Sequence, residues 1–103
     1  MPTPEFDREG YLVDPDDWNE ALAIELARRD NIELTNEHWT VLRFMRDFLE
    51  LHRVAPDARF VIRHLGDAHG VGRNRLFELF PYGYVQQACK IAGMRRPRTW
   101  STG

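Results

Sequence analysis

One amphipathic segment constrains the fold of this sequence more than any other feature. Thr35 can accept an early backbone N–H and so begin a helix. Pro56 disfavours helical geometry at Ala55, so this helix should end near Val54. Its apolar and aromatic side chains recur at helical spacing and form one wide face: Trp39, Val41, Leu42, Phe44, Met45, Phe48 and His52. Such a face must be buried, and we expect these residues in the core: Trp39, Phe44, Met45, Phe48 and Leu65.

The rest of the chain predicts four more helices and two less regular ends. The helices should cover residues 14–29, 57–68, 73–80 and 84–92. Asp14 or Asp16 would cap the first of them, and Gly93 would end the last. Residues 4–13 predict a short hairpin or an extended arm. Residues 94–103 contain three arginines and have little to bury, which predicts a mobile arm. The expected fold is mainly α (α+β), a single five-helix domain over residues 1–103.

Length and cysteine content limit the class of protein. With 103 residues the chain can form one core, and its single cysteine cannot form an internal disulfide. It has no apolar run long enough to span a bilayer, and its start is acidic, unlike a signal peptide. We therefore expect a cytoplasmic protein that is held together by packing and is not bound to a membrane.

Charge is divided unevenly along the chain. Residues 1–50 contain 13 acidic side chains and 5 basic ones, whereas residues 51–103 contain 3 acidic and 9 basic ones. Almost all of the basic residues are arginines, which favour paired contacts with carboxylate or phosphate. The second half should attract an anionic partner, unless it simply pairs with the acidic first half.

Several motifs resemble one known family. The run from Gln87 to Met94, with Leu79-Phe80-Pro81 before it and Pro97 after it, resembles the C-terminal signature of the DsrC/TusE family of sulfur-relay proteins. Further matching pieces occur in the same order along the chain: Gly10-Tyr11-Leu12, Trp18, the segment from Leu34 to Trp39, the segment from Arg43 to Phe48, and Arg59. Proteins of this family were once called the gamma subunit of dissimilatory sulfite reductase. The resemblance implies a small, mainly helical protein of sulfur metabolism.

The same resemblance implies roles for individual residues. In the family's sulfur carriers the working thiol lies eleven positions beyond the equivalent of Cys89, and that position here is Trp100. The resemblance makes Cys89 the partner of an arm thiol that this chain lacks. It also places a basic residue of the third helix near the docking site of the arm, which favours Arg59, with Arg63 one turn later. Trp100 itself could anchor the tail in a partner.

Cys89 has two interpretations from its sequence context. A lone cysteine on a helix is commonly a small buried hydrophobic residue. Alternatively Lys90, Arg95 and Arg96 could stabilise a thiolate and make Cys89 a persulfide acceptor, although a position near a helix C-terminus disfavours an anion. Both interpretations stay open at this stage.

The segment from Arg59 to Phe80 has the form of a helix-turn-helix, with a glycine turn at residues 69–72. Arg73, Asn74 and Arg75 are residue types that contact phosphate or base edges. However, helix pairs of this form are common, and a chain with a pI near 6.1 lacks the basic balance of most DNA-binding proteins. DNA is therefore an unfavoured partner.

Motifs of enzymes and cofactor-binding proteins are absent from the sequence. The four histidines contain no metal-binding pair, and one cysteine cannot complete a zinc site. The glycine turn lacks the lysine and the preceding strand of a phosphate-binding loop. We expect no metal, no cofactor and no stand-alone enzyme. The sequence favours a sulfur-relay component that binds sulfurtransferases or sulfite-reductase-like proteins, with Cys89 as a candidate acceptor; the alternatives are a DNA-binding regulator of sulfur genes and a non-carrier that occupies a carrier's docking site.

Overall fold

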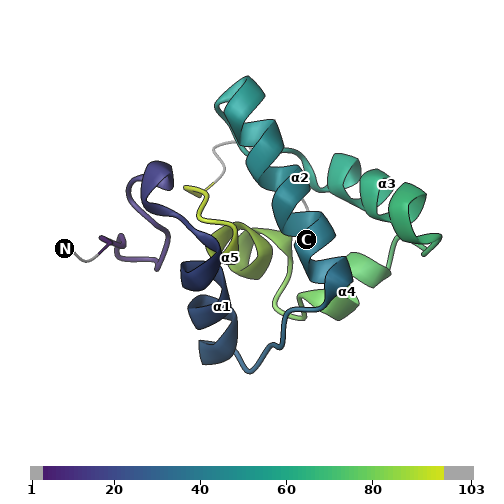
Figure 1. The fold of residues 1–103 in the computed structure, drawn as a ribbon, viewed down its shortest axis with the longest axis horizontal. Helices are drawn as coiled ribbons and strands as arrows, with labels where there is room; N and C mark the ends of the chain where they lie inside the picture. The colour runs from purple at the N-terminus through teal and green to yellow at the C-terminus, as the bar shows by residue number, and fades with distance from the viewer. Residues whose placement is uncertain (1–3, 97–103) are drawn as a thin grey trace.

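The computed structural model describes residues 4–96 and shows five α-helices around one core (Figure 1). α2 runs through the middle of the molecule, with α3 and α4 on one side and α1 and α5 on the other. In chain order the helices are α1 (Glu20–Arg29), α2 (Asn36–His52), α3 (Ala58–His69), α4 (Arg75–Leu79) and α5 (Cys89–Ile91). The prediction of a mainly helical, five-helix fold is confirmed.

The start of α2 is fixed by the side chain of His38. The backbone N–H of Thr35 donates to its Nδ1 at 3.0 Å, while its Nε2 donates to the carbonyl oxygen of Leu79 at 2.9 Å. His38 therefore ties the first turn of α2 to the end of α4. The helix ends at His52, two residues before the predicted end, and Arg53 follows as its cap with a φ of 60°. With 17 residues α2 is the longest helix, and no helix in the described part of the chain is long and apolar enough to cross a bilayer.

The predicted hairpin over residues 4–13 is wrong. Within the described residues it is reduced to a single antiparallel bridge between Phe6 and Leu12. The Asp7 carboxylate accepts two backbone N–H groups of the turn, including that of Tyr11, at 2.9 Å each. Backbone bonds also cross the turn, from Asp7 N–H to the Tyr11 carbonyl oxygen at 2.8 Å and from Val13 N–H to the Glu5 carbonyl oxygen at 2.9 Å, so side-chain and backbone bonds together hold it without two regular strands.

The first helix begins later than predicted. Asp14 caps only η1 (Pro15–Asp17), a single 3-10 turn. The chain is extended at Trp18, and α1 starts from a second cap, Asn19. This break lets the indole N–H of Trp18 donate to the carbonyl oxygen of Ile91 at 2.8 Å. A contact with a residue so distant in the sequence overrides the local start signal.

The last helix has two parts with different pitch. η2 (Tyr84–Ala88) is a π-helix, and α5 continues it directly. The backbone N–H of Cys89 bonds to the carbonyl oxygen of Tyr84, five residues earlier. Gly93 ends the helix as predicted, with a φ of 72° that few residues other than glycine adopt.

The core confirms part of the predicted list. Met45 and Leu65 are fully buried, and Trp39 and Phe44 are half-buried against the core. Phe48 is the wrong prediction: it is only half-buried and stacks on the exposed ring of Phe60 instead. It lies at the edge of the apolar face, where α3 covers α2 incompletely.

Truncating Met45 should therefore cost much more stability than truncating Phe48. Met45→Ala should lower the free energy of unfolding by about 2–5 kcal/mol, because it removes a fully buried side chain and leaves a cavity. Phe48→Ala should lower it by about 1 kcal/mol, because the ring is partly in water already. Urea unfolding of the two variants measures both values. Equal losses would place Phe48 in the core after all.

Candidate functional site

Cys89 is the only cysteine of the chain, and it is completely buried at the start of α5. Burial raises the pKa of its thiol to about 12, and a hydrogen bond with the Tyr84 hydroxyl opposes that rise only in part. Tyr84 is also buried, and its hydroxyl donates to the carbonyl oxygen of Pro56. At neutral pH the thiol is protonated and shielded from water, the condition of an unreactive cysteine.

A second tyrosine lies near this thiol. Tyr11 from the N-terminal turn is buried, and its hydroxyl donates to the carbonyl oxygen of Val85 at 2.9 Å. Burial raises the pKa of Tyr11, and the neighbouring Cys89 adds to the rise. The Lys90 ammonium lies 5.1 Å from the centre of the Tyr11 ring, over its face. The side chain of Lys90 therefore packs against the ring of Tyr11.

The other cations predicted to activate Cys89 also point elsewhere. Arg96 pairs with the carboxylate of Glu9, and Arg95 is exposed. The pKa of Cys89 is set by burial and Tyr84, with no contribution from either arginine. Closeness in sequence therefore did not bring these charges to the sulfur.

A half-buried arginine that sequence reasoning missed, Arg46, holds the cysteine-bearing end of the chain in place. Arg46 of α2 donates to the carbonyl oxygens of Ala92 at 3.1 Å and Pro15 at 2.9 Å. Its guanidinium also lies 4.7 Å from the centre of the Trp18 ring. Burial lowers the pKa of Arg46, and the bonds to carbonyl oxygens satisfy its donors. The sequence offered little signal for it, because Glu50 four residues later suggests an ordinary surface ion pair.

Gly93 allows the close approach on which this arrangement depends. A Cβ atom at Gly93 would lie only 2.4 Å from Cδ1 of Trp18. The positive φ of Gly93 turns the chain back after α5, so that the next residue, Met94, is buried. Of the arm predicted over residues 94–103, the structure describes three residues; the remainder, including Trp100, lies outside the described residues.

The predicted docking arginines of α3 are on the surface. The side chain of Arg59 is 85% exposed, and its Nε lies 3.3 Å from Oδ1 of Asp57, the residue that caps the same helix. Arg63 follows one turn later and is also exposed. Both belong to the side of α2 opposite α5, so the structure does not bring them together with Cys89.

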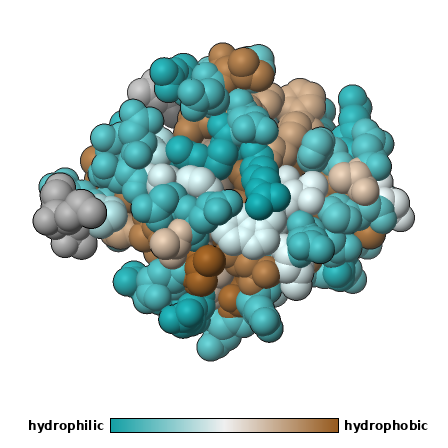
Figure 2. Space-filling view, in the orientation of Figure 1, coloured by the Kyte–Doolittle hydropathy of each residue, from teal (hydrophilic) through white to brown (hydrophobic). Residues whose placement is uncertain are grey.

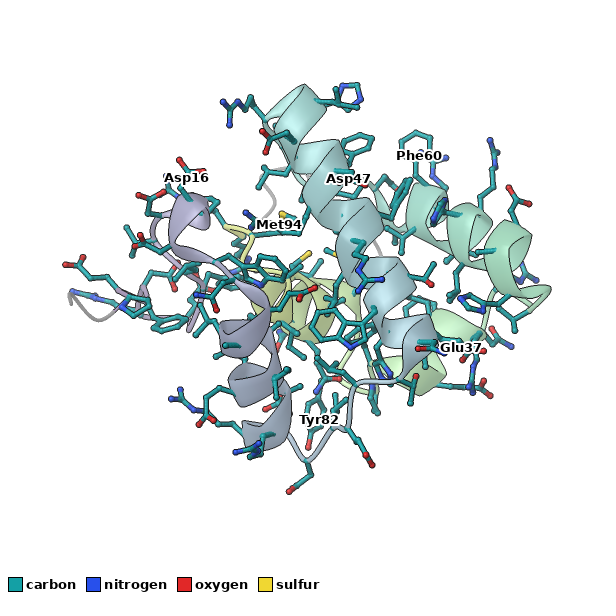
Figure 3. All side chains as sticks on the ribbon, viewed as in Figure 1. Asp16, Glu37, Asp47, Phe60, Tyr82 and Met94 are labelled. Atoms are coloured by element: carbon teal, nitrogen blue, oxygen red, sulfur yellow. The ribbon has the colours of Figure 1, made fainter. Side chains whose placement is uncertain are left out.

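The residues of the helix-turn-helix hypothesis lie near carboxylates. Arg75 donates to Glu37 at 2.6 Å and to Glu78 at 3.3 Å, and Figure 3 shows Glu37 beside α4. Arg73 and Asn74 line the same shallow depression as these two acids. α4 has only five residues, and phosphate groups would meet negative charge here. The arrangement is therefore poorly suited to a DNA duplex.

The described residues contain no cluster of side chains that could hold a metal ion. Between residues 4 and 96 no three His, Cys, Asp or Glu side chains are close enough to hold one metal ion. Two surface depressions of about 440 and 710 Å³ lie at the α1–α2 loop and before α4, and neither is lined by Cys89.

The sequence is similar to one family along almost its whole length. The family model described as DsrC like protein matches residues 2–100. The protein named Sulfurtransferase TusE from Sodalis glossinidius is 44% identical over 94 residues, which cover 88% of this chain and 87% of that protein. The protein of the same name from Photorhabdus laumondii is 41% identical over 96 residues, covering 90% and 86%.

Solved structures show the same fold. The oxidized gamma-subunit of the dissimilatory sulfite reductase (DsrC) from Archaeoglobus fulgidus matches with a TM-score of 0.85 at 33% identity, covering 94% of this chain and 91% of that one. DsrC from Allochromatium vinosum matches with a TM-score of 0.79 at 37% identity, covering 94% and 89%.

The burial of Cys89 predicts a thiol that resists alkylation. Between about pH 7 and pH 9 its reaction with iodoacetamide should stay slow, whereas an exposed cysteine, with a pKa near 8.5, would react progressively faster. Folding raises this pKa, so the associated stability should be present below about pH 8.5 and be lost as the pH rises toward 12. Mass spectrometry of timed samples measures the first effect, and unfolding in urea provides the control in which Cys89 reacts fully.

Gly93 and Gly70 provide a matched pair for testing the contact with Trp18. Both have a positive φ, but a Cβ at Gly70 would meet nothing within 4 Å. Gly70→Ala should lower the free energy of unfolding by about 1–2 kcal/mol, the cost of the left-handed backbone alone. Gly93→Ala should cost clearly more, because it must also displace Trp18. Equal losses in thermal unfolding would mean that the indole moves aside freely.

Proposed function

The chain belongs to the DsrC-like protein family, and we propose that it serves sulfur transfer by binding a protein of a sulfur relay without carrying sulfur on its own thiol. The observation that supports this proposal is the complete burial of Cys89, the only cysteine of the chain. The position eleven residues further on, where the resemblance places the carrier thiol, is Trp100.

The chemistry of sulfur transfer explains why burial matters. To accept sulfur, the Sγ atom of a thiolate must attack the outer sulfur of a persulfide, and the thiolate of the donor leaves. The attack requires a sulfur atom that is both deprotonated and accessible to the donor. In the folded state the thiol of Cys89 is protonated and covered by two tyrosines, so it is neither. Acceptance at Cys89 would first need Tyr11 or Tyr84 to move away.

The partner in this proposal is a sulfurtransferase or a sulfite-reductase-like protein, within the cytoplasm. The relatives support this class, since they are named Sulfurtransferase TusE and gamma-subunit of the dissimilatory sulfite reductase. The exposed arginines of this chain, including Arg59 and Arg95, would supply contacts to such a partner. A non-carrier that occupies a carrier's docking site is the form of the proposal that the buried thiol favours. DNA regulation is less well supported, because Arg75 is held by two acids.

The test is a binding and mass experiment with a purified, persulfide-loaded sulfurtransferase of the relay. The chain should form a complex with it in size-exclusion chromatography, yet its intact mass should not increase by a sulfur atom. The Trp100→Cys variant restores a thiol at the family's carrier position, and it should gain one sulfur under the same conditions. This variant also shows that the donor is active.

Two outcomes would contradict the proposal. If the unaltered chain gains a sulfur that Cys89→Ala abolishes, the chain is a carrier through Cys89. If it forms no complex with the sulfurtransferase or with a sulfite-reductase-like protein, partner binding is the wrong function.

A further inference from the structure

Five aromatic side chains form a cluster on the surface where the last turns of α2 meet α3. Phe44 stacks on His64 with ring centres 4.5 Å apart, and Phe48 stacks on Phe60 at 6.1 Å. His52 extends the row, 4.3 Å from Phe48. The cluster continues along α2, because each of its three members there follows the previous one by one helical turn.

This cluster is open to solvent. Phe60 is 46% exposed, and Leu51 and Val54 at the end of α2 are 78% and 60% exposed. Figure 3 shows Phe60 projecting from α3 at the outer edge of the molecule, and Figure 2 shows apolar side chains gathered over the upper end of α2 and the start of α3. We call the five clustered rings together with Leu51 and Val54 the aromatic face. A contiguous exposed face of this kind, rimmed by charge, is typical of a protein interaction site.

The charges around the aromatic face are unevenly placed. Three exposed arginines lie at the end of α2 and in the first half of α3: Arg53, Arg59 and Arg63. The one carboxylate recorded with them is Asp57, which pairs with Arg59 and also caps α3. Two aspartates lie further from the connection between α2 and α3: Asp47 is one helical turn before Leu51, and Asp67 is one helical turn after Arg63. Negative charge is therefore found toward the opposite end of the face.

We propose that the aromatic face binds an amphipathic helix of a partner protein, with the apolar side of that helix on the rings and acidic side chains against the three arginines. The spacing of Phe44, Phe48 and His52 by four residues complements apolar residues that recur every three or four positions on a second helix. Carboxylates match guanidinium groups in paired hydrogen bonds. This inference rests on the proposed function in that the partner is taken to be a relay protein.

A second copy of the chain fits this face less well. In a symmetric dimer the same patch faces itself, so the three arginines meet either one another or, with the two copies reversed, only the two carboxylates of Asp47 and Asp67. An acidic helix meets no such repulsion. Charge complementarity therefore selects the partner helix over self-association.

The experiment uses the full chain, labelled with nitrogen-15, and two synthetic helical peptides. Both carry leucine at every third or fourth position; the flanking residues are glutamate in one and lysine in the other. The glutamate peptide should bind at least about tenfold more tightly at low salt, and the difference should shrink as salt screens the charges. Amide shifts should concentrate in the second half of α2 and in α3.

Matched variants separate this face from general effects of charge and hydrophobicity. Phe60→Ser should weaken binding of the glutamate peptide by about tenfold, because it removes an aromatic anchor. Ile24→Ser removes a side chain that is 44% exposed on α1, and it should leave binding of this peptide unchanged. The double reversal Arg59→Glu with Arg63→Glu should weaken it by about tenfold as well. Reversing Arg28 and Arg29 of α1 to glutamate changes net charge equally and should have little effect.

Three outcomes would overturn the inference. Equal binding of the two peptides, or shifts on another face, would remove the site. A concentration-dependent dimer in sedimentation that Phe60→Ser abolishes would assign the face to a second copy. The experiment separates failure of this binding site from failure of the proposed function. If a relay protein binds the Phe60→Ser variant normally, only the aromatic face is refuted. If the glutamate peptide binds but no relay protein does, only the relay role is refuted.

Discussion

The position of the cysteine depends on the half-buried guanidinium of Arg46. α5 is only three residues long, so its final carbonyl groups cannot be satisfied by continuing the helix. Arg46 donates to one of them and to Pro15, and Trp18 under it donates to the carbonyl oxygen of Ile91. A cation at the negative end of a helix is electrostatically favourable, and its hydrogen bonds offset the cost of burial. Two distant segments, one near Pro15 and one near Ala92, are thereby fixed to one point on α2.

Local signals predicted the elements that depend on local interactions. The starts of α2 and α3 follow from caps at Thr35 and Asp57, whose hydrogen bonds lie within a few residues. The sequence could not show the break at Trp18, because its cause is a bond to Ile91 across the molecule. The N-terminal turn gave a hairpin signal, although among the described residues only one bridge forms there, between Phe6 and Leu12.

The site was harder to predict than the fold. Helical spacing placed Phe48 on the apolar face of α2, but it cannot say where a neighbouring helix ceases to cover that face. Lys90 lies next to Cys89 in sequence, yet the two side chains leave the helix in different directions, and Lys90 lies over the Tyr11 ring. The π-helical turn that pairs Tyr84 with Cys89 has no recognised sequence signal, so the depth of the thiol emerges only from the tertiary structure.

α2 lies between the segment that bears Cys89 and the exposed rings at α3. Successive residues of a helix are rotated by about 100°, so Arg46 and Phe48, two positions apart, point in nearly opposite directions. Arg46 faces the cysteine-bearing segment, and Phe48 faces α3 and the exposed rings. A partner bound at the aromatic face would therefore contact the same helix that holds Ala92 in place, without touching Cys89. If the aromatic face binds a partner as proposed, that binding would use the side of α2 opposite the one that holds the cysteine-bearing segment, so a closed thiol would not interfere with it.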